Sequence, residues 1–252
     1  MRPRAPVAAL YDVHGNLPAL EAVLADLTAI EPELVLVGGD IVSGPMPRET
    51  LDLLLALGER AVFIRGNADR QAADRSGASG DDVWAARDRW TGEQLTDEQR
   101  SFLARLPETA RIAVETLGPV LFCHGSPRSD EEIVTRATPE ERMREMLAGV
   151  DERVVVLGHT HVQFDRTAGG RRVVNAGSVG MPYADEPGAY WALLGPDVEL
   201  RRSGYDVESA AERIRATGFP GGDEFAREHV LTVVGVDEAT DHFERRAEAA
   251  RR

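Results

Sequence analysis

The chain has 252 residues, of which 42% are hydrophobic, and its formal net charge is −14 at pH 7. This length and composition suffice for a sizeable core, so we expect one domain over 1–252, and the acidic balance argues against a basic groove for nucleic acid. No apolar run approaches the ~20 residues of a membrane span and no secretory leader is evident, which predicts a cytoplasmic protein without membrane contact.

Five short apolar runs along the chain have the character of buried strands. Each run is followed by polar side chains that can bind a metal. The runs are 7–10, 34–37, 62–64, 120–122 and 154–157. The candidate ligands that follow them are Asp12, His14, Asp40, Asn67, His124, His159 and His161. Because all of them come at strand ends, we expect one site at one edge of the fold.

Helices are predicted where apolar residues recur at helical spacing behind a capping residue. Asn16 caps the first helix, which runs past Leu27 and ends before Pro32. Thr96 and Gln99 have the spacing of a capping box. Further helices are predicted over 47–57, from 138 onward and over 206–216. Since strand and helix alternate, the predicted fold class is α/β.

The ligand types narrow the choice of metal. Imidazoles, carboxylates and one amide, without a thiolate, suit Mn, Fe, Zn, Co or Ni better than Ca. Seven ligands exceed one tetrahedral ion but suit two ions about 3.5–4 Å apart that share a carboxylate. Each motif also has an ordinary alternative, since Asp40 and Asn67 follow glycines and suit turns, and a lone histidine is more often a surface or core residue. Their joint occurrence favours a metal centre.

In this order, the motifs resemble those of the calcineurin-like metallophosphoesterase superfamily. They are Asp12-x-His14, Gly-Asp40, Gly-Asn67-x-Asp69, His124-Gly and Gly-His159-Thr-His161. The later Asn175-Ala-Gly-Ser178 is similar to the Asn-Pro-Gly-Ser segment of its small bacterial phosphodiesterase-like branch. The resemblance covers roughly Val7 to Leu194.

The resemblance implies a four-layer α-β-β-α sandwich of two mixed sheets with helices outside. It also implies two divalent transition metal ions, with Mn as first choice and Fe, Zn, Ni or Co as alternatives, and a hydroxide between them that attacks phosphorus. Asp40 would bridge the ions. The first ion would be held by Asp12, His14 and His161, and the second by Asn67, His124 and His159.

One residue departs from the family pattern. The family usually carries histidine after Gly-Asn, where it is taken to protonate the leaving group or to steady the transition state, and here that position is Ala68. General acid catalysis is typically worth ~10²–10⁴-fold, so esters with poor leaving groups should react slowly. Asp69 either replaces the histidine or accepts hydrogen bonds from its own loop, and we favour the second alternative. The predicted catalytic residues are Asp40, Asn67 and Asp69.

A helical insert over about 70–107 lies between two ligand motifs and contributes no ligand. Its tryptophans, Trp84 and Trp90, either pack the insert onto the sandwich or form a lid, and packing is favoured. Loops above strand ends usually carry specificity, so the insert is the best candidate for choosing the substrate.

Three residues outside the metal motifs are predicted to contact substrate: Arg65, Ser178 and Tyr183. Arg65 could equally form a salt bridge with one of many acidic residues. The family often has arginine where Tyr183 stands, so this tyrosine would hydrogen-bond to a substrate or stack on a base rather than grip phosphate.

A helical extension over about 205–252 follows the motifs, and it carries no chemistry that the sequence reveals. His229 and His242 lie there without other ligand types around them, and we interpret both as surface or packing residues. The charged end, 243–252, either frays or packs on a partner subunit, which leaves a homo-oligomer open as an alternative.

The sequence therefore predicts a dinuclear metal-dependent phosphoesterase that hydrolyses a small soluble phosphoester, with a phosphodiester or nucleotide-like compound favoured over a broad range of monoesters. One alternative is a protein phosphatase, which would need an open groove and which Ala68 disfavours. Another is a non-catalytic scaffold of the same fold, although all seven metal ligands are intact.

Overall fold

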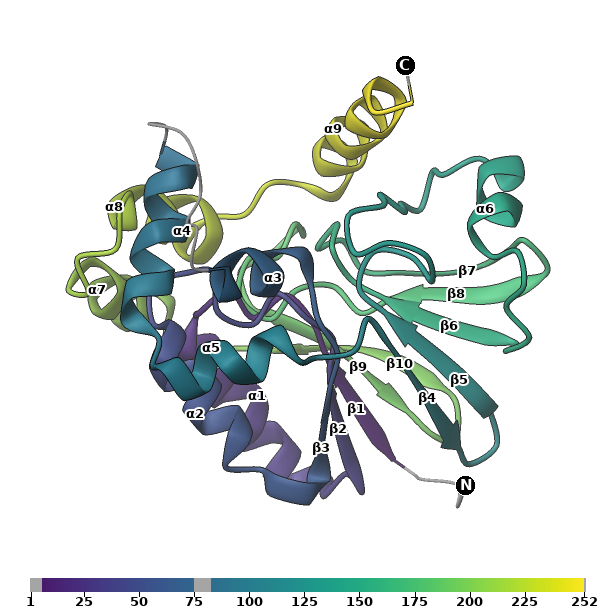
Figure 1. Cartoon of the computed structure of the whole chain (residues 1–252), viewed down its shortest axis with the longest axis horizontal. Coiled ribbons are helices and arrows are strands. Elements are labelled where there is room, and N and C mark those ends of the chain that lie inside the picture. The colour runs from purple at the N-terminus through teal and green to yellow at the C-terminus, as the bar shows by residue number, and fades with distance from the viewer. Residues whose placement is uncertain (1–5, 75–82, 252) are drawn as a thin grey trace.

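A computed structural model describes residues 6–74 and 83–251 and contains two five-stranded sheets (Figure 1). Both sheets combine parallel and antiparallel pairs, as the prediction of mixed sheets requires. The first sheet has the order β10 (Val198–Ser203), β9 (Ala189–Leu194), β1 (Val7–Leu10), β2 (Leu34–Val37) and β3 (Ala61–Phe63). The second has the order β4 (Thr109–Val114), β5 (Gly118–Cys123), β6 (Val154–Leu157), β8 (Arg171–Asn175) and β7 (Phe164–Ala168).

Strand alternation creates the layers. Because successive side chains of a strand point to opposite faces, Val7 and Ala9 of β1 join the core between the sheets, whereas Ala8 and Leu10 face the helices outside. The same alternation on β5 sends Phe122 to the central core and Cys123 to the outer one, so the cysteine is a core residue, as predicted. The four-layer α/β sandwich is therefore confirmed.

Helices cover the outer face of each sheet. The first sheet is covered by α1 (Leu17–Ile30), α2 (Pro47–Leu55) and α5 (Asp97–Ala104), and the second by α6 (Glu140–Met146). Asn16 caps α1 by accepting a 3.3 Å hydrogen bond from the Ala19 N–H. At α5 the Gln99 N–H donates to Thr96 Oγ1 (3.1 Å), and the Thr96 N–H donates to Gln99 Oε1 (3.0 Å), which confirms the predicted capping box.

Two boundaries differ from the prediction. The helix expected from 138 begins at Glu140, because Thr138 Oγ1 accepts a hydrogen bond from the Thr135 N–H instead of capping the helix. The second helix ends at Leu55, two residues early, and Gly58–Arg60 forms a 3-10 turn, η1.

The helix α3 (Asn67–Ala73) leads from the candidate ligand Asn67 into the insert, which continues with α4 (Val83–Gln94). The extension contributes α7 (Val207–Arg215), α8 (Gly222–Ala226), the π-helix η2 (Arg227–Leu231) and α9 (Val236–Ala249). In Figure 1, α4 lies beside α7 and α8 at one side of the sandwich, whereas α9 lies apart from them, toward α6. Trp90 of α4 packs edge-to-face on Phe219 of the extension, with ring centroids 5.3 Å apart, and not on the sheets, so its packing onto the sandwich stays a prediction. The side chain of Trp84 and residues 75–82 lie outside the described part, and a single domain over the whole chain stays a prediction.

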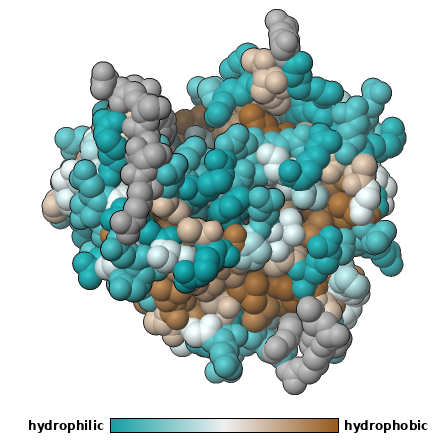
Figure 2. Space-filling view, in the orientation of Figure 1, coloured by the Kyte–Doolittle hydropathy of each residue, from teal (hydrophilic) through white to brown (hydrophobic). Residues whose placement is uncertain are grey.

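The face shown in Figure 2 is largely hydrophilic, in keeping with the 29% charged residues. None of the helices in the described part is both long and apolar enough to span a membrane.

Candidate metal centre

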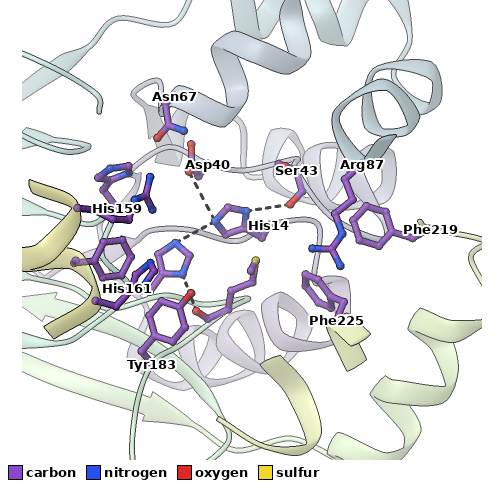
Figure 3. Close-up of a pocket in the computed structure, with 14 residues that line it drawn as sticks. His14, Asp40, Ser43, Asn67, Arg87, His159, His161, Tyr183, Phe219 and Phe225 are labelled. Carbon is purple, nitrogen blue, oxygen red and sulfur yellow. Dashed lines mark hydrogen bonds and ion pairs between the residues drawn. The ribbon is translucent and has the colours of Figure 1, made fainter. Parts of the chain in front are cut away.

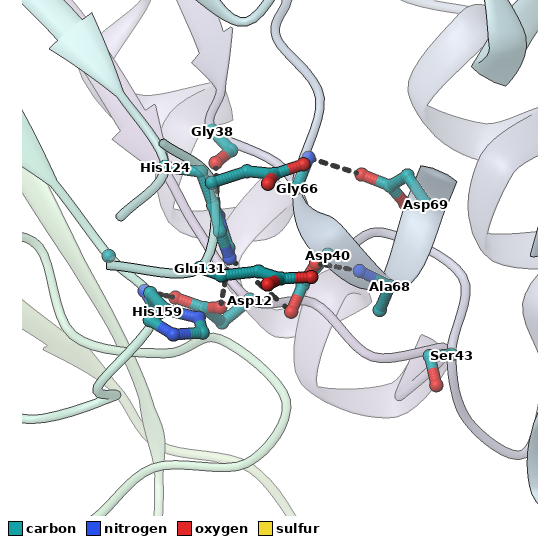
Figure 4. A network of polar contacts seen from close by, with 12 residues as sticks. Asp12, Gly38, Asp40, Ser43, Gly66, Ala68, Asp69, His124, Glu131 and His159 are labelled. Atoms are coloured by element: carbon teal, nitrogen blue, oxygen red, sulfur yellow. Dashed lines mark hydrogen bonds and ion pairs between the residues drawn. The ribbon is translucent and has the colours of Figure 1, made fainter. Parts of the chain in front are cut away.

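The loops after the strands bring the candidate ligands into two buried groups. Within each group the ligand atoms lie within 4.8 Å of one another. The first group is Asp12, His14 and His161, and the second is Asp40, His124 and His159. Asn67, the seventh candidate, lines a cavity that also reaches ligands of both groups. Figure 4 shows Asp12, Asp40, His124 and His159 pointing toward one another. The structure thus brings together the residues that the sequence motifs singled out.

Backbone carbonyls fix the tautomers of two histidines in the first group. His14 Nδ1 lies 3.0 Å from the carbonyl oxygen of Ser43, and His161 Nδ1 lies 2.7 Å from that of Met181. Because a carbonyl oxygen only accepts, each Nδ1 carries a proton, and each neutral ring presents a lone pair at Nε2. The two Nε2 atoms face each other at 3.2 Å. Between two neutral rings these lone pairs repel, and either a proton on one Nε2 or a metal ion between the two relieves the repulsion.

Three buried polar atoms of the candidate ligands make no hydrogen bond: Asp12 Oδ1, Asn67 Oδ1 and His124 Nε2. His124 is oriented in the same way as the first pair, since its Nδ1 lies 2.9 Å from the carbonyl oxygen of Gly38. A buried polar atom without a partner costs about 1–3 kcal/mol, and three of them point to groups that a ligand satisfies. All three are atoms that bind Mn, Fe or Zn well, so the residues present fit a pair of such ions.

The backbone of the site is held in an unfavourable conformation. Seven non-glycine residues of the described part have positive φ, and five of them are candidate ligands: Asp12, His14, Asp40, His159 and His161. Such conformations cost about 1–3 kcal/mol each and cluster at functional sites. The fold therefore stabilises this arrangement against local preference.

Two motif glycines allow the loops to approach the carboxylates closely. A Cβ atom on Gly66 would lie 2.1 Å from Asp40 Oδ1, and one on Gly158 would lie 2.5 Å from Asp12 Oδ2. Only glycine fits at either position. Asp40 Oδ1 also accepts a 2.8 Å hydrogen bond from the Ala68 N–H, which leaves Oδ2 to face the histidines.

Asp69 supports the site from behind (Figure 4). Its Oδ1 accepts from the Ile41 N–H (2.8 Å) and its Oδ2 accepts from the Gly66 N–H (3.0 Å). The side chain is fully buried, and burial followed by the nearby charge of Asp40 raises its pKa to about 7. The bond from Gly66 fits the favoured alternative, an acceptor for its own loop, and the bond from Ile41 joins this loop to that of Asp40. The catalytic role of Asp69 stays a prediction.

Of the three residues predicted to contact substrate, one lines the cavity and two bond elsewhere. Ser178 is fully buried, and its Oγ donates to the Asp12 carbonyl oxygen (2.7 Å) and accepts from the Met181 N–H (2.8 Å), so it faces the backbone and not a substrate. Arg65 forms a 2.7 Å ion pair with Glu108 away from the cavity, which is the alternative left open by the sequence. Tyr183 does line the cavity and stacks on His161, with ring centroids 5.5 Å apart.

The cavity over the ligands has a volume of about 580 Å³ and a wall that the sequence did not reveal. Figure 3 shows Phe219, Phe225 and Arg87 on the opposite side of the cavity from His159 and His161. Further lining comes from α9, through His242, Phe243 and Arg246. Two of the missed side chains, His242 and Arg246, are spaced i, i+4 on a helix, but this spacing does not indicate which surface the helix covers.

The two other histidines were predicted as surface or packing residues. His229 is half-buried, and its ring centroid lies 5.3 Å from that of Phe225 and 6.3 Å from that of Tyr183, which fits packing. His242 is exposed, as predicted, yet it also lines the cavity over the ligands, which the prediction did not include.

Without a bound metal, the four ligand histidines differ in protonation. Although burial opposes protonation, Asp40 and Asp12 raise the pKa of His124 to about 10, and Asp12 likewise raises the pKa of His161. Burial, reinforced by the charge of His124, lowers the pKa of His159 to about 4. Burial and the charge of His161 also lower the pKa of His14. At neutral pH a proton on the His124 ring therefore competes with a metal for Nε2, and the raised pKa of His161 strengthens the same competition there.

Comparison with known proteins places these features in a family. A model described as the calcineurin-like phosphoesterase superfamily domain matches residues 6–195. The structure of a hypothetical protein from Pyrococcus horikoshii is similar at a TM-score of 0.75 and 25% identity, over 88% of this chain and 96% of that one. A metallophosphoesterase from Sphaerobacter thermophilus is similar at a TM-score of 0.73 and 27% identity, over 92% of this chain and 99% of that one. An uncharacterized protein of Methanocaldococcus jannaschii is 24% identical over 234 residues, which is 85% of this chain and 93% of that protein.

Replacing Asp40, the carboxylate predicted to bridge two ions, should remove metal. Asp40→Asn substitutes a neutral amide where a negative charge offsets the repulsion between two close cations. We expect elemental analysis of manganese-reconstituted protein to give one ion or fewer per chain, against two for the unaltered protein. Asp223→Asn makes the same change at an exposed position and should retain two. Two ions retained in Asp40→Asn would remove Asp40 from the bridging position.

Metal binding should release protons at pH 7. The raised pKa values of His124 and His161 mean that these rings hold protons below those values, and a metal requires the Nε2 lone pair. Calorimetric titration with Mn²⁺ should therefore give heats that depend on the protonation enthalpy of the buffer, and the apparent affinity should fall as the pH is lowered. Heats that are identical in two buffers of different protonation enthalpy would contradict this protonation scheme.

Proposed function

Because the chain belongs to the calcineurin-like phosphoesterase superfamily and is thus a metal-dependent phosphoester hydrolase, we propose that its metal centre is dinuclear and that its substrate is a small phosphoester. A phosphodiester or nucleotide-like compound is the proposed substrate class. The observation that carries the proposal is the pair of buried ligand groups at the floor of a cavity.

The position of Asp40 supports a bridging role. Its Oδ2 lies 3.4 Å from Nε2 of His124, in its own group, and 3.8 Å from Nε2 of His14, in the other group. One carboxylate oxygen thus reaches both groups. Two divalent ions held there would lower the pKa of a water molecule and neutralise the charge of a phosphoryl group.

Side chains and carbonyl groups of this chain would hold and orient the ions. Asp12 and Asp40 supply the negative charges that hold two cations in a buried place. Carbonyl groups behind His14, His124 and His161 keep their Nε2 atoms aimed inward. Such support behind the ligands is what fixes a metal site well enough for chemistry.

The cavity supports a small substrate. Its volume of about 580 Å³ lies within the range of roughly 300–1,000 Å³ that is usual for small-molecule sites. Phe219, Phe225 and Phe243 give it an apolar wall beside Tyr183, on which a flat group such as a base could lie. A protein phosphatase would need an open groove instead.

The leaving group has no evident proton donor at the family's usual place. Ala68 offers only a methyl group and a backbone N–H that is already bonded to Asp40. Asp69 is buried behind the loop. Among the described residues that line the cavity, His242 is the imidazole that belongs to neither ligand group.

Turnover of a diester by the metal-loaded protein tests the proposal. With two manganese ions bound, the protein should hydrolyse bis(4-nitrophenyl) phosphate, a chelator should abolish this hydrolysis, and Mn²⁺ should restore it better than Ca²⁺.

Replacing His14, His124, His159 or His161 by alanine should in each case lower both metal content and turnover. We expect turnover to fall by about 100-fold or more, which is about 2.7 kcal/mol of lost transition-state stabilisation. Two bound ions without turnover of any phosphoester would sink the proposal.

The absent donor should make the rate depend steeply on the leaving group. A nitrophenolate leaves without a proton, whereas an alkoxide needs one, so alkyl esters should be slow. Ala68→His puts an imidazole beside Asp69 and should raise kcat/KM for alkyl esters more than for nitrophenyl esters. The measurement is kcat/KM over a matched series of esters in both proteins. If the unaltered protein already shows a flat dependence, another group donates the proton, and His242→Gln becomes the next comparison.

A further inference from the structure

The helix α9 reaches the metal cavity from outside the matched family domain, which ends at 195. Its docking is specific. Glu244 Oε1 accepts hydrogen bonds from Thr135 Oγ1 (2.6 Å), Thr138 Oγ1 (2.9 Å) and Arg142 Nη2 (2.8 Å). Arg142 is itself buried, so this ion pair is partly shielded from water and fixes α9 in one place.

A second face of α9 then points to the cavity. Phe243 and Ala247 pack against Ile133, and Phe243 also lines the cavity together with His242 and Arg246, which are one helical turn apart. A chain of ring contacts connects this face to the metal ligands. Tyr183 stacks on His161, the Phe243 ring centroid lies 5.9 Å from that of Tyr183, and the Arg246 guanidinium carbon lies 5.8 Å from the Phe243 centroid.

Two arginines line the cavity, and they differ in what they bind. The Nε of Arg87 donates to the Pro220 carbonyl oxygen (3.0 Å), and its Nη2 donates to Glu224 (3.1 Å), so Arg87 joins the insert to the extension. The Arg246 side chain has no hydrogen bond or ion pair with any residue in 6–74 or 83–251, although acidic residues are abundant in this chain. Its guanidinium remains available at the edge of the cavity.

We propose that Arg246 binds an anionic oxygen of the phosphoester substrate, so that α9 completes the active site and helps to select phosphoesters of high negative charge. This inference rests on the proposed function, because the metal centre must hold the phosphoryl group nearby. A guanidinium forms paired hydrogen bonds with phosphate oxygens. Its positive charge beside two cations is unfavourable until an anion enters, which ties its position to an anionic ligand.

The decisive comparison is Arg246→Gln against Arg245→Gln, which removes the same charge from the exposed neighbouring position on α9. Inorganic phosphate is titrated calorimetrically into manganese-loaded protein. We expect the Kd for phosphate to rise about 10-fold or more in Arg246→Gln and to stay near that of the unaltered protein in Arg245→Gln. Arg246→Lys, which keeps a charge but not the planar fork, should fall between them. Metal content should be unchanged in all three variants.

Turnover adds a second readout. KM should rise more than kcat falls in Arg246→Gln, and the loss in kcat/KM should be larger for 4-nitrophenyl phosphate, a dianion, than for bis(4-nitrophenyl) phosphate, a monoanion. A role in docking α9 alone would instead lower Tm and affect both esters equally, and this result would overturn the inference. So would an unchanged Kd for phosphate, or no phosphate binding by the unaltered protein. If the unaltered protein turns over neither ester, the proposed function fails, whereas the difference in phosphate Kd still decides the role of Arg246.

Discussion

The site depends on one constraint: the lone pairs of several histidine and carboxylate side chains face one another in a buried space. Carbonyl oxygens hold the protons of His14 and His161 on Nδ1, and the two Nε2 atoms meet at 3.2 Å. Two buried carboxylates, Asp12 and Asp40, face the same space. So many electron-rich atoms in a low dielectric are unfavourable unless positive charge lies between them. Protons on His124 and His161 supply part of this charge without metal, and divalent ions supply it more fully.

The surrounding structure is arranged to hold that unfavourable geometry. Ser178 bonds to the backbone of Asp12, and Asp69 accepts from the N–H groups of Ile41, beside Asp40, and Gly66, beside Asn67. These contacts oppose the strain of ligands with positive φ. They also explain why two residues of typical site chemistry, Ser178 and Asp69, lie within a site without facing its cavity: their polar atoms are used to position the ligands.

The sequence locates the candidate ligands, which the structure brings together, because their positions are set locally. Each lies within a few residues of a strand end, so strand prediction and residue type together locate it, as with Asp12 after β1 and His124 after β5. The direction in which a side chain points depends instead on partners that are distant in the sequence. Ser178 was expected at the substrate from its place in the segment similar to Asn-Pro-Gly-Ser, but its partner is the Asp12 carbonyl, 166 residues away in the chain. The same holds for α9, since its position depends on Glu244 meeting Arg142, 102 residues earlier.

Local positions and long-range contacts place different parts of the site, which we call its floor and its wall. The floor is formed by sandwich loops within the matched domain, and its ligands serve phosphoester chemistry in general. The wall is formed by the insert and the extension, where Arg87 joins α4 to the segment before α8 and Glu244 joins α9 to the loop before α6. Because each link is polar and partly buried, removing one partner would leave the other unsatisfied, which favours a single placement of the wall. None of the candidate metal ligands takes part in these links, so the position of the wall and the geometry of the floor are set by separate contacts.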